Sequence, residues 1–390
     1  MRILFSFIGG DGHFRPLVPI ARAAEAAGHT VAVAGSGRMA AAIERAGFTA
    51  LPTSEVKTTK PATTREAIEP VDLAKEERVM REGFAGSGAR RHAAVLPGFV
   101  REWRPDVLVR DEVDFGAAAV AELFGLPCVN VLVLVAGTFL RKELVADPLH
   151  ELRGELGLPR DAELTMLDRD LVLAPFPASF RGPDAPLPPT AFNYRVDVPA
   201  VEPVPGATSA SASAERASQR PMIYFTLGTY PTNPELYARV LAGLSELDAD
   251  IVATVGESVD PAEFGPQPDH VRIERFIPQE ELLGRCDLVI SHAGSGSLLG
   301  TLAHGLPTLL LPMGADQPHN ARRCVELGVG QVLDVATVTP EEVREAARTT
   351  LADDSCRRAA ERIRDDFGEL PGVEAALQRI EQLHQRPAAR

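Results

Sequence analysis

The stretch from Asp287 to Asn320, DLVISHAGSGSLLGTLAHGLPTLLLPMGADQPHN, decides the fold of this chain. It begins with a short apolar strand, passes through the turn from His292 to Ser297, and continues into an apolar helical pattern that starts at Leu298 and ends at Gly305. A second strand follows from Thr308 to Pro312. Strand, glycine-rich turn, helix and strand in this order are typical of a parallel α/β sheet.

The turn in this stretch predicts an anion site. The first amides of a helix have no partner within the helix, and the helix dipole adds partial positive charge there. A phosphate fits such a site, and Asp316 and Gln317 follow the second strand, where they can contact a group attached to the phosphate. The spacing Gly294-x-Gly296-x-x-x-Gly300 is one residue too long for a dinucleotide-binding fingerprint, which disfavours an NAD-type site.

Length and charge restrict the remaining functions. A chain of 390 residues is too long for one ordinary core, so we expect two domains. The formal net charge of -14 disfavours nucleic acid and anionic membranes as partners. The only lysines, Lys57, Lys60, Lys75 and Lys142, lie in the first half. The second half therefore cannot hold a Walker P-loop or a pyridoxal Schiff base, since both need a lysine.

Cysteine usage and hydropathy predict a cytoplasmic protein. The four cysteines are scattered and form no C-x-x-C pair, which suits a reducing compartment. No window approaches the ~20 apolar residues of a membrane span. The sequence Asp168-Arg169-Asp170 resembles a metal-binding D-x-D, but its position just before an apolar strand favours a helix cap or a solvent-facing role. We therefore predict no metal site.

The chain reads as two α/β halves. Met1 to Leu51 alternates strand and helix, and a polar stretch from Thr53 to Ala94 with weak helices then covers a ligand site or forms mobile surface. A further strand, helix and strand follow, the last strand from Cys128 to Val135. The predicted boundaries are a first domain at 1–200, a Pro-, Ala- and Ser-rich linker at 201–219, a second domain at 220–370, and a C-terminal helix in 371–390 that is a candidate to cross back to the first domain.

His13 is a candidate general base. It follows the glycine-rich turn after the first strand, where open α/β sheets expose functional groups. Asp111 ends another strand, from which it could orient the ring of His13 and stabilise its protonated form; Asp114 is a weaker candidate for this partner. A purely structural histidine remains open. A base in one half and an anion site in the other suggest transfer chemistry across a cleft.

Several motifs together resemble those of family 1 glycosyltransferases. They are Phe276-Ile-Pro-Gln279, His292-Ala-Gly-Ser-Gly-Ser297, Gly305-Leu-Pro307, Pro312 and Asp316-Gln317. Gly9-Gly-Asp-Gly-His-Phe-Arg-Pro16 is similar to the acceptor-side loop of that family, which carries its base histidine. The resemblance is strongest to bacterial enzymes that decorate antibiotics and other natural products. It implies the GT-B fold: two Rossmann-like α/β/α domains that face a cleft, the first binding the acceptor and the second the nucleotide sugar.

The resemblance also assigns roles to single residues. His13 would be the base and Asp111 its partner. Phe276 would stack on the base of the donor, and the backbone of Ile277 would bond to it. The diphosphate would be held by the side chain of His292, by Thr229 nearby, and by the amides of Gly294, Ser295, Gly296 and Ser297. Asp316 and Gln317 would bond to sugar hydroxyls.

Gly300 departs from the family pattern. Many members that use uridine diphosphate carry a glutamate at this position, which binds the ribose hydroxyls, and a glycine cannot do so. The departure favours a thymidine diphosphate sugar as co-substrate over a uridine diphosphate sugar, although a promiscuous site would look the same.

The predicted activity is metal-independent, inverting transfer of a sugar to a hydroxyl of a small apolar natural product. Two alternatives remain: a nucleotide-sugar epimerase of the same fold, and a non-catalytic accessory protein that activates a partner glycosyltransferase. The expected partners are the aglycone and the nucleotide sugar, and a homodimer stays open.

Overall fold

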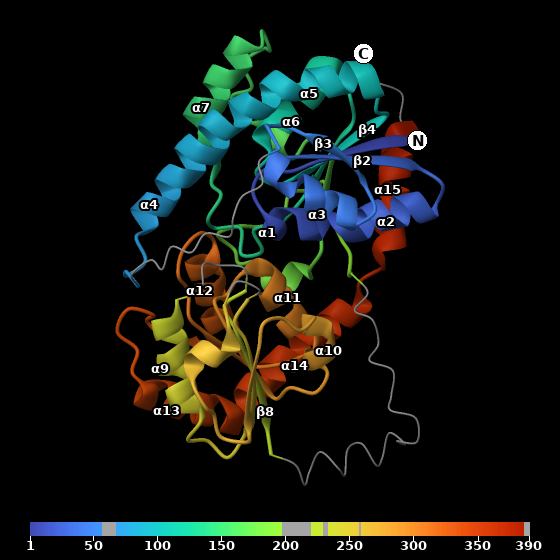
Figure 1. Cartoon of the computed structure of the whole chain (residues 1–390). Coiled ribbons are helices and arrows are strands. Elements are labelled where there is room, and N and C mark those ends of the chain that lie inside the picture. Colours follow the sequence, from blue (N-terminus) through green and yellow to red (C-terminus); the bar gives the residue numbers. More distant parts are fainter. Residues whose placement is uncertain (57–67, 197–219, 229–232, 257–258, 386–390) are drawn as a thin grey trace. The chain divides into compact units, whose positions relative to one another are not determined.

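A computed structural model describes residues 1–56, 68–196, 220–228, 233–256 and 259–385 of the chain (Figure 1). The chain divides into two compact units. The first comprises Met1–Lys60, Asp72–Asp197 and Glu369–Arg390, and the second comprises Pro61–Val71 and Val198–Gly368. The linker predicted at residues 201–219 lies outside the described residues.

The described strands of the first unit form one parallel sheet with the order β3-β2-β1-β4-β5-β6-β7. Their bounds are β1 Arg2–Ser6, β2 Thr30–Gly35, β3 Thr49–Pro52, β4 Val107–Asp111, β5 Cys128–Val131, β6 Leu171–Ala174 and β7 Ala191–Asn193. The sheet grows in both directions from β1, as in a doubly wound fold. The carboxyl ends of β1 and β4 are therefore neighbours, with Ser6 paired to Arg110.

Helices cover both faces of this sheet (Figure 1). The helices on one face are α2 Val18–Ala26, α3 Ala40–Arg45 and α15 Val373–Gln385, and those on the other are α5 Ala89–Trp103, α6 Phe115–Phe124 and α7 Lys142–Glu155. Successive side chains of β1 point to opposite faces of the sheet, which explains the two cores. Ile3 and Phe5 pack in the core with α2, α3 and α15, and Leu4 packs in the core with α5, α6 and α7. A sheet buried on both faces needs such continuous apolar strands.

The last helix, α15, packs within the first unit. Leu377 and Ile380 are buried in the same core as residues of α2. The ring of His29, just before β2, pairs through Nε2 with Glu381 Oε1 at 2.8 Å. α15 therefore contacts the rest of the first unit through both apolar and polar side chains.

The strand predicted from Cys128 to Val135 is shorter in the structure, because β5 ends at Val131. The amides of Val133 and Leu134 donate to the carboxylate of Glu112 at 3.0 and 2.9 Å instead of continuing the ladder. The buried Glu112 side chain thus bends the chain away from the sheet at the carboxyl end of β5.

The stretch from Thr53 to Ala94 is more ordered than the sequence predicts, although residues 57–67 lie outside the described part. It contains α4 Leu73–Arg78 and a π-helical segment, Val79–Gly88, which runs directly into α5. Met80 and Ala85 are fully buried in the core beneath. The prediction of weak helices was wrong because small residues and a π-helical spacing give no clear period of 3.6.

The described strands of the second unit also form a parallel sheet, in the order β10-β9-β8-β11-β12-β13. Their bounds are β8 Met222–Thr226, β9 Asp250–Thr254, β10 Val271–Glu274, β11 Leu288–Ser291, β12 Thr308–Leu310 and β13 Gly330–Val332. β8 and β11 lie side by side at the centre, so the turns that follow them emerge at the same edge.

Helices of the second unit have the bounds α9 Pro234–Leu244, α10 Gln279–Leu283, α11 Ser295–Ala303, α12 Gln317–Leu327, α13 Pro340–Ala352 and α14 Asp354–Glu369. Short helices of the chain are α1 Asp11–Phe14 and the 3-10 segments Arg15–Leu17, Gly37–Met39, Thr165–Leu167, Ala178–Phe180 and Pro261–Phe264. α11 begins at Ser295, three residues before the predicted start. α12 was not predicted at all, because two of its four buried residues, Gln317 and Asn320, are polar and interrupt the apolar pattern.

Within the described ranges, no helix is long and apolar enough to cross a membrane. The four cysteines are free and buried, as expected of structural thiols.

Candidate active site

His13 lies in α1, directly after the turn that follows β1. The turn depends on Gly9, whose φ of 120° lies in the left-handed region. A Cβ at Gly9 would overlap the ring of His13, so the ring packs directly on the backbone of the turn. The side chain is 21% exposed, which leaves one edge of the ring accessible to a ligand.

The structure brings His13 and Asp111 together. His13 Nδ1 lies 2.6 Å from Asp111 Oδ2. An ionised carboxylate only accepts hydrogen bonds, so the proton of the neutral ring sits on Nδ1 and the lone pair on Nε2. Burial raises the pKa of Asp111, and the hydrogen bond from His13 opposes this rise. The charge of the carboxylate therefore depends on its histidine partner.

Asp114, the other candidate partner, is engaged elsewhere. It is the N-cap of α6, where Oδ1 accepts from the amide of Ala117 at 3.0 Å. Its Oδ2 accepts from Ser6 Oγ at 2.5 Å and pairs with His92 Nδ1 at 2.9 Å. The partner of His13 is therefore Asp111. Asp114 pairs with a different histidine, His92, which was not predicted to be a site residue.

The predicted anion site lies at the N-terminus of α11. Gly294 is the N-cap, so the amides of Ser295, Gly296 and Ser297 lie in the first turn, where a helix offers no carbonyl to them. The turn before it is unusual, since Ala293 has a left-handed φ of 63°. Such backbone strain is concentrated at functional sites.

His292 forms one wall of this turn. A Cβ at Gly228 or at Gly294 would overlap its ring, so the imidazole is packed between two glycines. Burial lowers the pKa of His292 to about 4. Its Nδ1 is buried and has no hydrogen-bond partner among the described residues. At neutral pH the ring therefore supplies a hydrogen-bond donor and an acceptor but no positive charge.

The low pKa of His292 predicts that acid destabilises the fold. The pKa is about 4 in the folded chain and ~6.5 in the unfolded chain, so between these values the unfolded chain binds more protons and stability rises with pH. On acidification, roughly 3 kcal/mol is lost from pH 6.5 downward until pH 4. Calorimetric unfolding of wild type and His292→Gln across this range is expected to show a smaller loss of unfolding temperature in the variant. Parallel losses in the two proteins contradict the assignment.

Asp316 and Gln317 begin α12 beside the anion site. Asp316 Oδ2 accepts from Ser295 Oγ at 2.6 Å and from Asn320 Nδ2 at 2.7 Å. Gln317 Oε1 accepts from the amide of Met313 at 2.8 Å. Both side chains therefore support the loop that precedes α12 and tie it to α11.

Asn320 is a site residue that the sequence analysis gave no role. It is fully buried, and its Nδ2 donates to the carbonyl of Ala293 at 3.0 Å as well as to Asp316. Its signal in the sequence is its position four residues after Asp316, on the same face of a helix. Since the helix itself was missed, this signal could not be used.

The predicted contacts to the base and ribose lie after β10. Phe276 is 53% exposed, which leaves a large apolar ring face in solvent. Ile277 packs partly against the apolar cluster of α10. Gln279 Nε2 donates to the carbonyl of Ser297 at 3.2 Å. A Cβ at Gly300 would overlap this Gln279 nitrogen. Thr229, also predicted near the diphosphate, lies outside the described residues.

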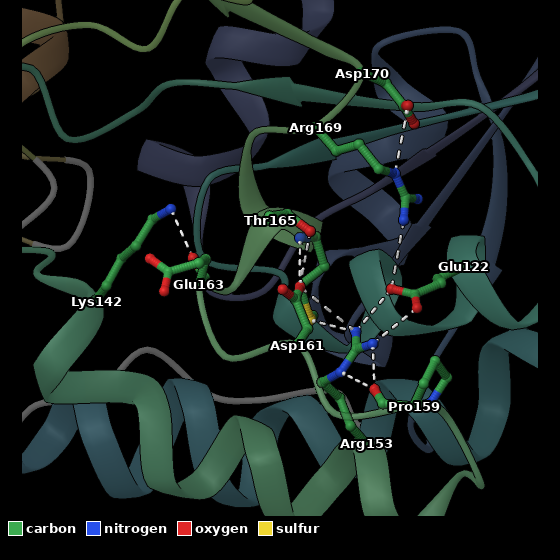
Figure 2. A network of polar contacts seen from close by, with 10 residues as sticks. Glu122, Lys142, Arg153, Pro159, Asp161, Glu163, Thr165, Arg169 and Asp170 are labelled. Atoms are coloured by element: carbon green, nitrogen blue, oxygen red, sulfur yellow. Dashed lines mark hydrogen bonds and ion pairs between the residues drawn. The ribbon is translucent and has the colours of Figure 1, made fainter. Parts of the chain in front are cut away.

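The carboxylates of Asp168 and Asp170 have protein partners, and Figure 2 shows Arg169 beside Asp170, with Nε 3.5 Å from Oδ1. Asp170 Oδ2 accepts from the amide of Cys128 at 3.0 Å, and Asp168 pairs with Lys142 at 3.2 Å. The sequence predicted a helix cap or a solvent-facing role for this motif. Asp170 has neither role, because it accepts a hydrogen bond from the backbone of β5. In the part of the chain that the structure describes, no cluster of three or more potential metal ligands occurs.

Comparisons with known proteins show which chains this one is similar to. Residues 238–383 match the family model of the erythromycin biosynthesis protein CIII-like C-terminal domain. The chain is 28% identical to a 10-deoxymethynolide desosaminyltransferase from Streptomyces venezuelae, over 100% of this chain and 99% of the relative. A solved calicheamicin glycosyltransferase matches with a TM-score of 0.78 at 21% identity, over 99% of this chain and 98% of the other. The chain has the GT-B fold of natural-product glycosyltransferases.

A second GT-B structure is a spinosyn rhamnosyltransferase complexed with thymidine diphosphate. It is 25% identical, with a TM-score of 0.76, over 98% of this chain and 100% of the other. The resemblance and the fold class that the sequence predicts are thereby confirmed. The relatives also support a glycosyltransferase activity for this GT-B chain.

Proposed function

We propose that this GT-B chain transfers a sugar from a thymidine diphosphate sugar to a hydroxyl of a small apolar natural product, with inversion and without a metal ion. The contact of 2.6 Å between His13 and Asp111 carries the proposal. The desosaminyltransferase relative and the thymidine diphosphate complex of the spinosyn enzyme support the donor and the acceptor class. In this proposal residues 1–200 bind the acceptor and residues 220–370 bind the donor.

In the proposed reaction His13 Nε2 accepts the proton of the acceptor hydroxyl. The oxygen attacks the anomeric carbon, and the bond from that carbon to the diphosphate oxygen breaks on the opposite side, which inverts the configuration. Asp111 keeps the proton of the neutral ring on Nδ1 and stabilises the imidazolium that forms. The proton remains on His13 until the product leaves.

The leaving diphosphate gains negative charge in the transition state. The amides of Gly296 and Ser297 and the α11 dipole face this charge without having to reorganise, and His292 adds a neutral N–H donor. Asp316 and Gln317 are proposed to present their remaining polar atoms to sugar hydroxyls.

The test is an incubation of the purified full-length chain with thymidine diphosphate sugars and a panel of aglycones. We expect one glycoside and one thymidine diphosphate per turnover, no dependence on chelator, and an inverted anomeric configuration by NMR. Release of nucleotide at the same rate without an acceptor would identify an epimerase instead. Transfer that requires the addition of a second glycosyltransferase would identify an accessory protein.

Gly300 yields a prediction about the donor nucleotide. Thymidine diphosphate is expected to stabilise the wild type against heat more than uridine diphosphate does. Gly300→Glu is expected to reverse this order, because its carboxylate can accept from a ribose 2'-hydroxyl, a contact of ~1.5 kcal/mol or more, or about tenfold in Kd. Thermal shift and calorimetric titration with both nucleotides measure the change.

The matched control is Gly300→Ala. Its Cβ also displaces the amide of Gln279 but adds no carboxylate, so we expect weaker binding of both nucleotides and no reversal. Stronger stabilisation of the wild type by uridine diphosphate overturns the role assigned to Gly300.

A further inference from the structure

A second buried imidazole–carboxylate pair lies behind His13 and Asp111. The side chain of His92 in α5 is 5% exposed and that of Asp114 is 0% exposed, and His92 Nδ1 lies 2.9 Å from Asp114 Oδ2. The proposed mechanism uses neither residue. A buried ionisable pair of this kind is costly to build, because both groups lose their hydration.

Four elements of the first unit hold this pair in place. Thr53, just after β3, lies with Oγ1 3.2 Å from His92 Nε2. Ser6, at the end of β1, donates to Asp114, and the amide of Ala117 in α6 donates to the other oxygen. The pair thus connects β1, the end of β3, α5 and the first turn of α6.

Close packing of two helices brings His92 to this point. A Cβ at Gly116 would lie 2.7 Å from His92 Cβ and would also overlap the carbonyl of Ala89. Only a glycine at this position lets α6 approach α5 so closely. The contact between His92 and Asp114 therefore depends on a specific helix–helix geometry.

The pair is linked to Asp111 by a short turn. The amide of Asp114 donates to the carbonyl of Asp111 at 3.2 Å, so a movement of one residue moves the other. Two carboxylates three residues apart, both fully buried, would repel one another if both were ionised and unpaired. Each of the two has its own histidine instead.

We propose that His92 and Asp114 are positioning residues, which keep the Asp111 carboxylate ionised and oriented on His13. The inference rests on the proposed function, in which Asp111 must be a carboxylate. The charge on His92 offsets that of Asp114, and the hydrogen bonds from Ser6 and Ala117 fix the turn that carries Asp111.

The charges around the two groups agree with this role. Burial lowers the pKa of His92, but Asp114 and more weakly Asp111 overcome this effect and raise it above the ordinary value. Burial likewise opposes the ionisation of Asp114, yet His92 and Ser6 lower its pKa. Among the described residues, the charge of Arg91 also lowers the pKa of His92, and His13 and Arg110 lower that of Asp111.

The decisive variants are His92→Gln and Asp114→Asn. Loss of the cation in His92→Gln is expected to raise the apparent pKa of the His13–Asp111 pair and to move the acid limb of the pH profile of kcat/KM to higher pH. Loss of the anion in Asp114→Asn is expected to move it to lower pH. Each variant is expected to lose up to ~10²-fold in kcat with little change in KM for the donor.

The double variant His92→Gln with Asp114→Asn removes both charges and is expected to bring the acid limb back toward that of the wild type. A structural role alone would give lower unfolding temperatures and an unshifted limb in all three variants, and this result overturns the proposal. His29→Gln is the matched control, because it breaks another histidine–carboxylate pair of the same unit, with Glu381, and is expected to change stability only.

An NMR titration of the His13 imidazole in the labelled chain tests the same inference without turnover. We expect its midpoint to rise in His92→Gln and to fall in Asp114→Asn. Should the wild type show no transfer at all, the proposed function fails while this titration still decides the inference. Where His92→Gln does not fold, Ser6→Ala removes only one hydrogen bond to Asp114, and an unchanged His13 midpoint in that variant argues against the coupling.

Discussion

A His13→Ala variant is expected to lose ~10²- to 10⁴-fold in kcat for transfer, because removal of a positioned general base costs this much. The His13 side chain is 21% exposed, and its Nδ1 lies 2.6 Å from Asp111, so Nε2 is the nitrogen proposed to act as the base. An alanine leaves the acceptor hydroxyl without a proton acceptor and leaves the buried Asp111 carboxylate without its partner. Quantified glycoside formation at saturating donor and aglycone measures the loss.

Two controls separate this effect from misfolding. Thermal stabilisation by thymidine diphosphate is expected to be unchanged in His13→Ala, because the proposed nucleotide contacts all lie in the second unit. His29→Ala removes a histidine of the same unit that pairs with Glu381, and it is expected to retain transfer. Undiminished transfer by His13→Ala contradicts the assignment of the base.

The juxtaposition of His13 and Asp111 could be predicted because it depends on regular structure. Both residues follow or end apolar strands that are unmistakable in the sequence, and parallel neighbours present their carboxyl ends at one edge. The same reasoning located the turn from His292 to Ser297 after β11. Strand order and sheet edge are thus accessible from apolar patterning alone.

Side-chain hydrogen bonds set the boundaries that the sequence did not predict. β5 stops at Val131 because Glu112 takes the next amides, and this glutamate is 22 residues before Leu134. α11 starts at Ser295 because Gly294 serves as its N-cap, although two serines and a glycine in the first turn look like a loop. Such contacts depend on three-dimensional proximity that periodicity does not encode.

The charge state of the site was also hidden from the sequence. His292 has a pKa of about 4 because its ring is buried between Gly228 and Gly294. The pattern of residue types does not predict this burial. His92 was passed over because it lies in a polar stretch whose helices were judged weak. Its role depends on Asp114, which lies on another helix, and on the packing of Gly116 against α5.

The largest effect is expected for Asp111→Asn, with a loss of about 10⁴-fold in kcat, as for a general base that loses its orienting acid. The carboxylate of Asp111 can only accept, which fixes the proton of His13 on Nδ1. The amide of an asparagine can donate to Nδ1 instead, so the proton moves to Nε2 and blocks the atom that should accept. The shape of the site is retained while the tautomer is wrong.

Asp106→Asn is the matched control, because Asp106 precedes the same strand at its opposite end, where it accepts from the amide of Arg2 at 2.7 Å. It is expected to retain transfer. If His13 and Asp111 act as one unit, the double variant His13→Ala with Asp111→Asn is expected to be no slower than the slower single variant, since residues that act together are not additive. A double variant whose loss equals the product of the two single losses shows that Asp111 acts independently of His13.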